Sequence, residues 1–143
     1  MNQMLKMGMP EAPYYAHDIA YAASKTANVL HAVQLNKLLN KEGIAAFSAN
    51  PGMALSNTVK KTMERLGKEV ADSLGWKKNI DQGAATTLVA ALDPKLAENT
   101  KETVLLSDCQ VWGDEIPGWA RDEKAAERLW KLSEEIVEGV AGK

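Results

Sequence analysis

Tyr21 and Lys25 are the residues whose types and spacing best suit proton-transfer chemistry. A phenol and an ammonium group four residues apart lie on the same face of a helix, one turn from each other. The positive charge of Lys25 favours the ionised phenolate, so Tyr21 could exchange a proton near neutral pH. Such a pair suits carbonyl and alcohol chemistry. The same spacing in an ordinary helix would make only a surface contact, so the surrounding motifs decide between the two interpretations.

Several short motifs follow this pair along the chain. An apolar run at residues 44–48 leads into Asn50-Pro51-Gly52, and the run 81–87 reads Asp-Gln-Gly-Ala-Ala-Thr-Thr before Leu92-Asp93-Pro94. In order and spacing, these motifs and the Tyr-x-x-x-Lys pair resemble the C-terminal half of the short-chain dehydrogenase/reductase superfamily. The run 24–30 is most similar to the branch that contains retinol-dehydrogenase-like and related microbial and fungal reductases. The resemblance covers nearly all of residues 15–138.

The resemblance implies an oxidoreductase that transfers hydride between NAD or NADP and the carbonyl or alcohol group of a small-molecule substrate. It implies that Tyr21 is the acid/base, and that Lys25 favours its ionised form and hydrogen-bonds the nicotinamide ribose. It also implies that Tyr21, Lys25, Pro51, Gly52 and Ser56 contact the nicotinamide end of the cofactor.

Two features of the family pattern are not found in these 143 residues. The ten glycines form no Gly-rich turn of the kind that binds a dinucleotide pyrophosphate, and residues 1–20 contain no serine that could polarise the substrate carbonyl. We therefore interpret residues 1–14 as an irregular N-terminal segment and residues 15–143 as the C-terminal part of a reductase domain. The alternative is a catalytically inactive remnant that acts as a helical interaction module, forming a homo-oligomer through the Tyr21 helix.

Composition is ordinary for a single water-soluble domain, with 45% hydrophobic and 25% charged residues. A net charge of −2 gives no reason to expect a nucleic acid or an anionic membrane as partner. Cys109 is the only cysteine, is expected to be a packed thiol, and fits a reducing compartment, so we expect the cytoplasm. His17 and His31 are too far apart in sequence to suggest a metal site.

The expected fold class is α/β, half of a doubly wound Rossmann-type fold that is mostly helical with about two parallel strands. Hydrophobic periodicity and capping residues predict a helix over residues 17–39, one capped by Ser56 or Asn57, one capped by Asp81 that runs through Leu92, and one that starts near Asp122. The last helix is expected to bury Ala126, Ile136 and Val137, and the strands are expected at residues 44–48 and 103–106. The lysine pairs at 60–61 and 77–78 are expected to be solvated. Trp112 and Trp119 are expected to pack against the body, with covering of a substrate pocket as the alternative.

Overall fold

The computed structural model describes residues 16–73, 78–99, 104–113 and 115–142. The chain forms two compact units: residues 1–46 with 114–143, and residues 47–113. The irregular segment expected at residues 1–14 lies outside the described residues. None of the helices in the described ranges is long and apolar enough to cross a membrane.

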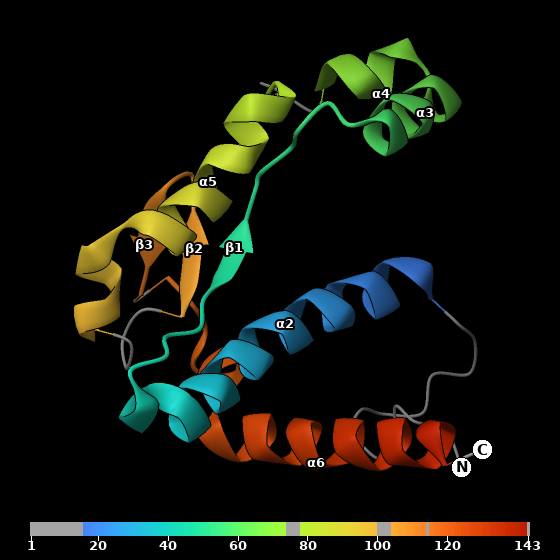
Figure 1. The fold of residues 1–143 in the computed structure, drawn as a ribbon. Helices are drawn as coiled ribbons and strands as arrows, with labels where there is room; N and C mark the ends of the chain where they lie inside the picture. Colours follow the sequence, from blue (N-terminus) through green and yellow to red (C-terminus); the bar gives the residue numbers. More distant parts are fainter. Residues whose placement is uncertain (1–15, 74–77, 100–103, 114, 143) are drawn as a thin grey trace. The chain divides into compact units, whose positions relative to one another are not determined.

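The first unit is built on two long helices that pack side by side, α2 (His17–Leu39) and α6 (Glu123–Ala141) (Figure 1). No glycine or proline interrupts residues 17–39, and the side chains of Val29 and Ala32 are buried. The helix passes into the 3-10 helix η1 (Asn40–Glu42), which Gly43 ends in the left-handed conformation with a φ of 76°. The predicted helix over residues 17–39 is therefore confirmed.

The side chain of Asn36 fixes the segment that follows α2. Its Nδ2 donates to the Ala46 carbonyl at 2.8 Å, and its Oδ1 accepts from the Ala46 N–H at 2.7 Å. Both backbone groups of Ala46 are thus satisfied by a buried amide instead of by a neighbouring strand. The strand expected at residues 44–48 was wrong in its bounds, because regular pairing begins only at Ser48.

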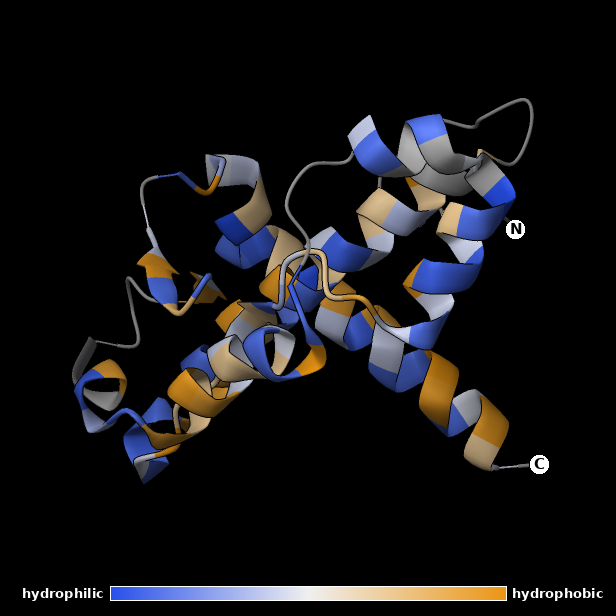
Figure 2. Ribbon diagram, turned by 90° about the horizontal axis from the view of Figure 1, so that it is seen from above, coloured by the Kyte–Doolittle hydropathy of each residue, from blue (hydrophilic) through white to orange (hydrophobic). Residues whose placement is uncertain are grey.

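The helix α6 begins after Asp122, whose Oδ1 accepts from the Ala125 N–H at 2.6 Å, and it ends at Ala141. The expected burial of Ala126 is confirmed, since it is 1% exposed. The expected burial of Ile136 and Val137 was wrong, because they are 41% and 65% exposed. Figure 2 shows hydrophobic residues near the C-terminal end of this helix. Helical periodicity in the sequence shows which apolar residues share a face of the helix, but it does not show which of them another element covers.

An ion-pair network joins α2 to α6 at the carboxylate of Glu127. Lys131, one turn further along α6, donates to Oε1 at 2.8 Å, and Lys37 of α2 approaches Oε2 at 3.4 Å. The hydrogen bond from Lys131, and then the one from Lys37, hold the pKa of the Glu127 carboxyl below its ordinary value. The same hydrogen bond raises the pKa of Lys131.

The second unit contains a three-stranded mixed sheet in the order β1-β2-β3. The strand β1 (Ser48–Asn50) pairs in parallel with β2 (Leu105–Ser107), with Ser48 opposite Leu105. The two parallel strands of the predicted fold class are confirmed, although Thr103 of the second predicted strand lies outside the described residues. The strand β3 (Gln110–Trp112) pairs antiparallel with β2 and was not predicted.

The strand β3 escaped prediction because its hairpin turn carries no glycine or asparagine. Asp108 and Cys109 have φ values of 51° and 61°, so both central residues of the two-residue turn are left-handed. Such turns usually contain Asn-Gly or Asp-Gly, and only the first of these two positions fits that signature.

Helices follow β1 in the second unit, and their capping residues are defined by side-chain bonds. Ser56 caps α3 (Asn57–Leu66), as predicted, by accepting from the Val59 N–H at 3.3 Å. Gly67 separates α3 from α4 (Lys68–Ser73).

The next helix, α5 (Ile80–Leu92), begins two residues earlier than the predicted cap at Asp81 would place it. Asn79, not Asp81, is its cap, because Asn79 Oδ1 accepts from the Gln82 N–H at 2.8 Å while Gln82 Oε1 accepts from the Asn79 N–H at 2.9 Å. This reciprocal pair is a capping box with Asn and Gln in the two roles. The 3-10 helix η2 (Pro94–Asn99) follows α5.

Candidate active site

Tyr21 and Lys25 lie one turn apart on the continuous helix α2. The Lys25 Nζ lies 5.3 Å from the centroid of the Tyr21 ring, so the ammonium group faces the ring itself. Both side chains are exposed, Tyr21 to 60%. The structure therefore brings together the two residues that sequence reasoning paired, on a solvent-accessible part of the first unit.

The hydroxyl of Ser24, between these two residues, is used by the helix itself. Its Oγ donates to the Tyr21 carbonyl at 2.7 Å, and Thr26 Oγ1 donates in the same way to the Ala22 carbonyl at 3.2 Å. Back-bonding of this kind is common for hydroxyl residues inside helices.

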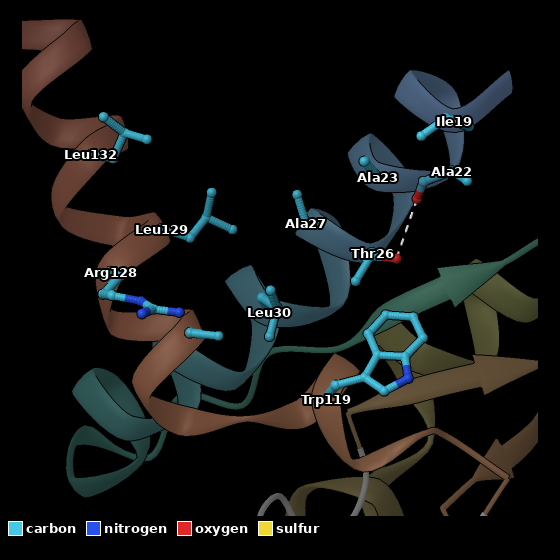
Figure 3. A pocket seen from close by; sticks show the side chains of 11 residues that line it. Ile19, Ala22, Ala23, Thr26, Ala27, Leu30, Trp119, Arg128, Leu129 and Leu132 are labelled. Atoms are coloured by element: carbon cyan, nitrogen blue, oxygen red, sulfur yellow. Dashed lines mark hydrogen bonds between the residues drawn. The ribbon is translucent and has the colours of Figure 1, made fainter. Parts of the chain in front are cut away.

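An apolar pocket of about 370 Å³ lies between α2 and α6, and sequence reasoning did not predict it (Figure 3). Trp119, in the 3-10 helix η3 (Gly118–Arg121), is 66% exposed, so its expected packing against the body was wrong. It lies at a pocket, as the alternative expectation had it, and the binding of a substrate there stays a prediction. Tyr21 and Lys25 are not part of the lining. The lining residues are Ile19, Ala22, Ala23, Thr26, Ala27, Leu30, Trp119, Ala125, Arg128, Leu129 and Leu132.

Pro51 and Gly52 form a turn immediately after β1 in the second unit. Gly52 has a φ of 68°, a left-handed conformation that favours glycine. Its N–H donates to Asn50 Oδ1 at 2.9 Å, and Asn50 Nδ2 donates to Ser107 Oγ at 3.2 Å. The turn is therefore tied through Asn50 to the end of β2, at the carboxyl edge of the two parallel strands.

Ser56 follows this turn and caps α3 with its hydroxyl oxygen. A serine hydroxyl can accept one hydrogen bond while donating another, so the capping role is compatible with a contact to a ligand. The five residues predicted for the site thus fall into two groups. Tyr21 and Lys25 belong to the first compact unit, and Pro51, Gly52 and Ser56 belong to the second.

Sequence reasoning missed Lys78, which lies against the Pro51-Gly52 turn. Lys78 is only 7% exposed and forms an ion pair with Asp108 of the β2–β3 turn, so the expectation that it is solvated was wrong. A Cβ atom added to Gly52 would lie 2.8 Å from the Lys78 Nζ. In the sequence, the burial of Lys78 was indicated only by its position just before the cap of α5.

The same hairpin turn carries Cys109, which is exposed, so the expectation of a packed thiol was wrong. Its backbone N–H donates to the buried Thr86 Oγ1 at 3.1 Å, and its sulfur lies 3.8 Å from the same oxygen. The bond to Thr86 joins the hairpin turn to α5.

Comparisons with known proteins relate this chain to named dehydrogenases. It is 36% identical over 131 residues to the short-chain dehydrogenase TIC 32 A, chloroplastic, of Brassica napus, covering 88% of this chain and 39% of that protein. It is 32% identical over 130 residues to retinol dehydrogenase 12 of Mus musculus, covering 86% of this chain and 37% of that protein. The WW domain-containing oxidoreductase of Gallus gallus is 27% identical over 135 residues, covering 94% of this chain and 31% of that protein.

The chain belongs to the short-chain dehydrogenase/reductase superfamily, as the resemblance of its motifs implied. It spans about a third to two fifths of the length of the curated relatives it matches. No family model matches the chain. No solved structure matches it significantly.

Proposed function

We propose that this chain carries the acid/base part of a short-chain dehydrogenase/reductase site, which acts on the carbonyl or alcohol group of a small molecule. The observation that carries the proposal is the Tyr21-Lys25 pair on α2, in a chain related over most of its length to named dehydrogenases. Ordinary surface pairs also occur at this spacing, but they do not come with the ordered motifs that follow here.

In the proposed mechanism, Tyr21 gives a proton to the substrate oxygen during carbonyl reduction and takes it back during alcohol oxidation. Its exposure lets a small molecule reach the phenol. Lys25, with its ammonium group 5.3 Å from the centre of the Tyr21 ring, is the cationic partner that we propose for this tyrosine. Lys25 would also hydrogen-bond the ribose hydroxyls at the nicotinamide end of NAD or NADP.

The residues of the second unit fit the nicotinamide end of such a cofactor. The backbone of the Pro51-Gly52 turn is exposed and is held in place through Asn50, and Ser56 offers a hydroxyl close by in sequence. When bound, the nicotinamide would supply or accept the hydride. These 143 residues contain no Gly-rich turn, so we assign them no contact with the pyrophosphate or adenosine parts of the cofactor.

The apolar pocket between α2 and α6 supports a second candidate, a helical interaction module. Two large side chains at this pocket, Ile19 and Trp119, are 62% and 66% exposed, and exposed apolar groups in one place favour association. In this alternative the chain forms a homo-oligomer through α2. Sedimentation of the wild-type chain and of Ile19→Asp tests it, with a concentration-dependent dimer lost in the variant as the expected result.

For the location of the reaction we propose the cytoplasm, because the single cysteine gives the chain no internal disulfide. The name of the Brassica napus relative places that protein in the chloroplast. Imaging of the tagged protein in its native cell distinguishes these compartments.

The activity is tested in a chimera that joins the part of the Brassica napus relative that this chain does not match to residues 15–143 of this chain. We expect the chimera to oxidise NADH or NADPH in the presence of small aldehydes, and the isolated 143 residues to show no turnover. The full-length relative, assayed in parallel, is the positive control. A folded chimera without activity, beside an active control, would contradict the proposed function.

A further inference from the structure

Lys78 is a buried cation at the carboxyl edge of the parallel strands. It is 7% exposed, and its ammonium group pairs with the carboxylate of Asp108, which follows β2 directly. A buried ammonium group is costly unless it is paired, so Lys78 depends on Asp108, whose own side chain is 65% exposed. Ligands of open α/β sheets bind beyond this edge of the strands.

The backbone of Lys78 holds the residues that follow Gly52. Its N–H donates to the Met53 carbonyl at 2.9 Å, and its carbonyl accepts from the Leu55 N–H at 2.9 Å, which makes a parallel bridge to Ala54. Its side chain then runs along the bare Cα of Gly52. A Cβ atom there would lie 2.8 Å from Nζ and 3.0 Å from Cε, so another residue at this position would displace the end of the Lys78 side chain.

The other end of the ion pair lies in a turn that needs outside support. Asp108 and Cys109 both have positive φ values, which is unfavourable for residues with side chains. The turn is held on one side by the ion pair of Asp108 with Lys78, and on the other by the bond from the Cys109 N–H to the buried Thr86. The network thus joins the turn after β1 to the turn after β2.

We propose that Lys78 and Asp108 are positioning residues, which hold the Pro51-Gly52 backbone in the conformation that receives the nicotinamide. The inference rests on the proposed function, because it takes this turn as part of a nicotinamide site. Neither residue is assigned a contact with the substrate. Their effect is exerted through Gly52, against which Lys78 packs, and through Asn50 and Ser107, which bond the same two strand ends together.

The test compares amide hydrogen exchange, measured by NMR on the 143-residue chain, in the wild type, Lys78→Met, Asp108→Asn and the double variant. Asn tolerates the left-handed conformation at least as well as Asp, so Asp108→Asn removes the charge without disfavouring the turn. The matched control is Lys37→Met, which breaks the exposed ion pair with Glu127 in the other unit.

We expect Lys78→Met and Asp108→Asn each to speed exchange at the Gly52, Leu55 and Cys109 amides by about tenfold or more. The amide of Asp93 at the end of α5 and the amides of α6 should keep their exchange rates. The double variant should speed exchange at the turn amides no more than Lys78→Met does. Lys37→Met should leave all three turn amides unchanged. Unchanged exchange at these amides in Asp108→Asn, or equal acceleration throughout the second unit, would overturn the proposal.

A titration with millimolar nicotinamide mononucleotide separates this inference from the proposed function. In the wild type we expect shifts of the Gly52 and Ser56 amide signals, and in Lys78→Met and Asp108→Asn we expect these shifts to be lost or reduced several-fold. Equal shifts in wild type and variants would overturn the positioning role. No shifts even in the wild type would contradict the nicotinamide site of the proposed function, and the exchange rates alone would then decide whether the ion pair positions the turn.

Discussion

At the scale of single residues, the candidate site depends on a few side chains with unusual surroundings. Lys25 faces the ring of Tyr21 on an exposed helix, whereas Lys78 is buried against Gly52 and paired with Asp108. The Tyr21-Lys25 pair could be predicted because four-residue spacing fixes proximity within one helix. The burial of Lys78 could not be predicted, since it depends on a bridge to Ala54, which is 24 residues earlier in the sequence.

Gly52→Ala is expected to destabilise the second unit by about 2–3 kcal/mol. About 1–2 kcal/mol comes from placing a side chain at positive φ, and the remainder from contact with the held Lys78 side chain. Gly43→Ala is the matched control, because Gly43 also has a positive φ but no atom within 4 Å of an added Cβ. Denaturant unfolding measures both. Equal losses of unfolding free energy in Gly52→Ala and Gly43→Ala would show that Lys78 does not restrict the residue type at position 52.

Glu127 should titrate at a lower pH than an ordinary glutamate, because hydrogen bonds from Lys131 and then Lys37 favour its charged form. The pairing therefore stabilises the folded chain above the pKa of the unfolded carboxyl, and this contribution is lost as the pH falls through the folded pKa. NMR titration of the carboxyl carbon measures the midpoint. Lys131→Met should raise the midpoint more than Lys37→Met does, and an unchanged midpoint in Lys131→Met would contradict the assignment.

At the scale of elements, helices were predicted better than strands. The bounds of α2 follow from local sequence, since residues 17–39 contain no helix breaker and Gly43 follows closely. The strands β1 and β3 depend on partners distant in sequence: Asn36 replaces strand pairing at Ala46, and Lys78 and Thr86 support the turn before β3. Such tertiary contacts leave no local pattern to read.

Gly83→Ala should destabilise the second unit, although alanine favours a helix over glycine. The gain in helix propensity is up to about 1 kcal/mol. An added Cβ would lie 2.6 Å from the Ala54 Cβ, and overpacking of this kind costs about 1–3 kcal/mol. Gly139→Ala in α6 is the control, because no atom lies within 4 Å of its added Cβ, and this change should be neutral or stabilising. A stabilised Gly83→Ala variant would show that α5 does not pack closely on residue 54.

At the scale of the whole molecule, sequence motifs identified the family more readily than they located its site. The order of the motifs predicted membership of the short-chain dehydrogenase/reductase superfamily and an α/β fold, and both are confirmed. The predicted site residues are divided between two compact units, Tyr21 and Lys25 in one and Pro51, Gly52 and Ser56 in the other. Their joint action on a cofactor stays a prediction, because motif order gives residue identity but not the distances between units.

The turnover number of the chimera with Tyr21→Phe, measured at the nicotinamide absorbance, tests the central claim most directly. Loss of the phenolic proton should lower kcat by at least about a hundredfold, since general acid/base catalysis contributes about 10²–10⁴ in rate. The unsubstituted chimera, assayed in parallel, gives the reference kcat. If Tyr21→Phe retains the kcat of the unsubstituted chimera, Tyr21 is not the acid/base and the proposed site is wrong.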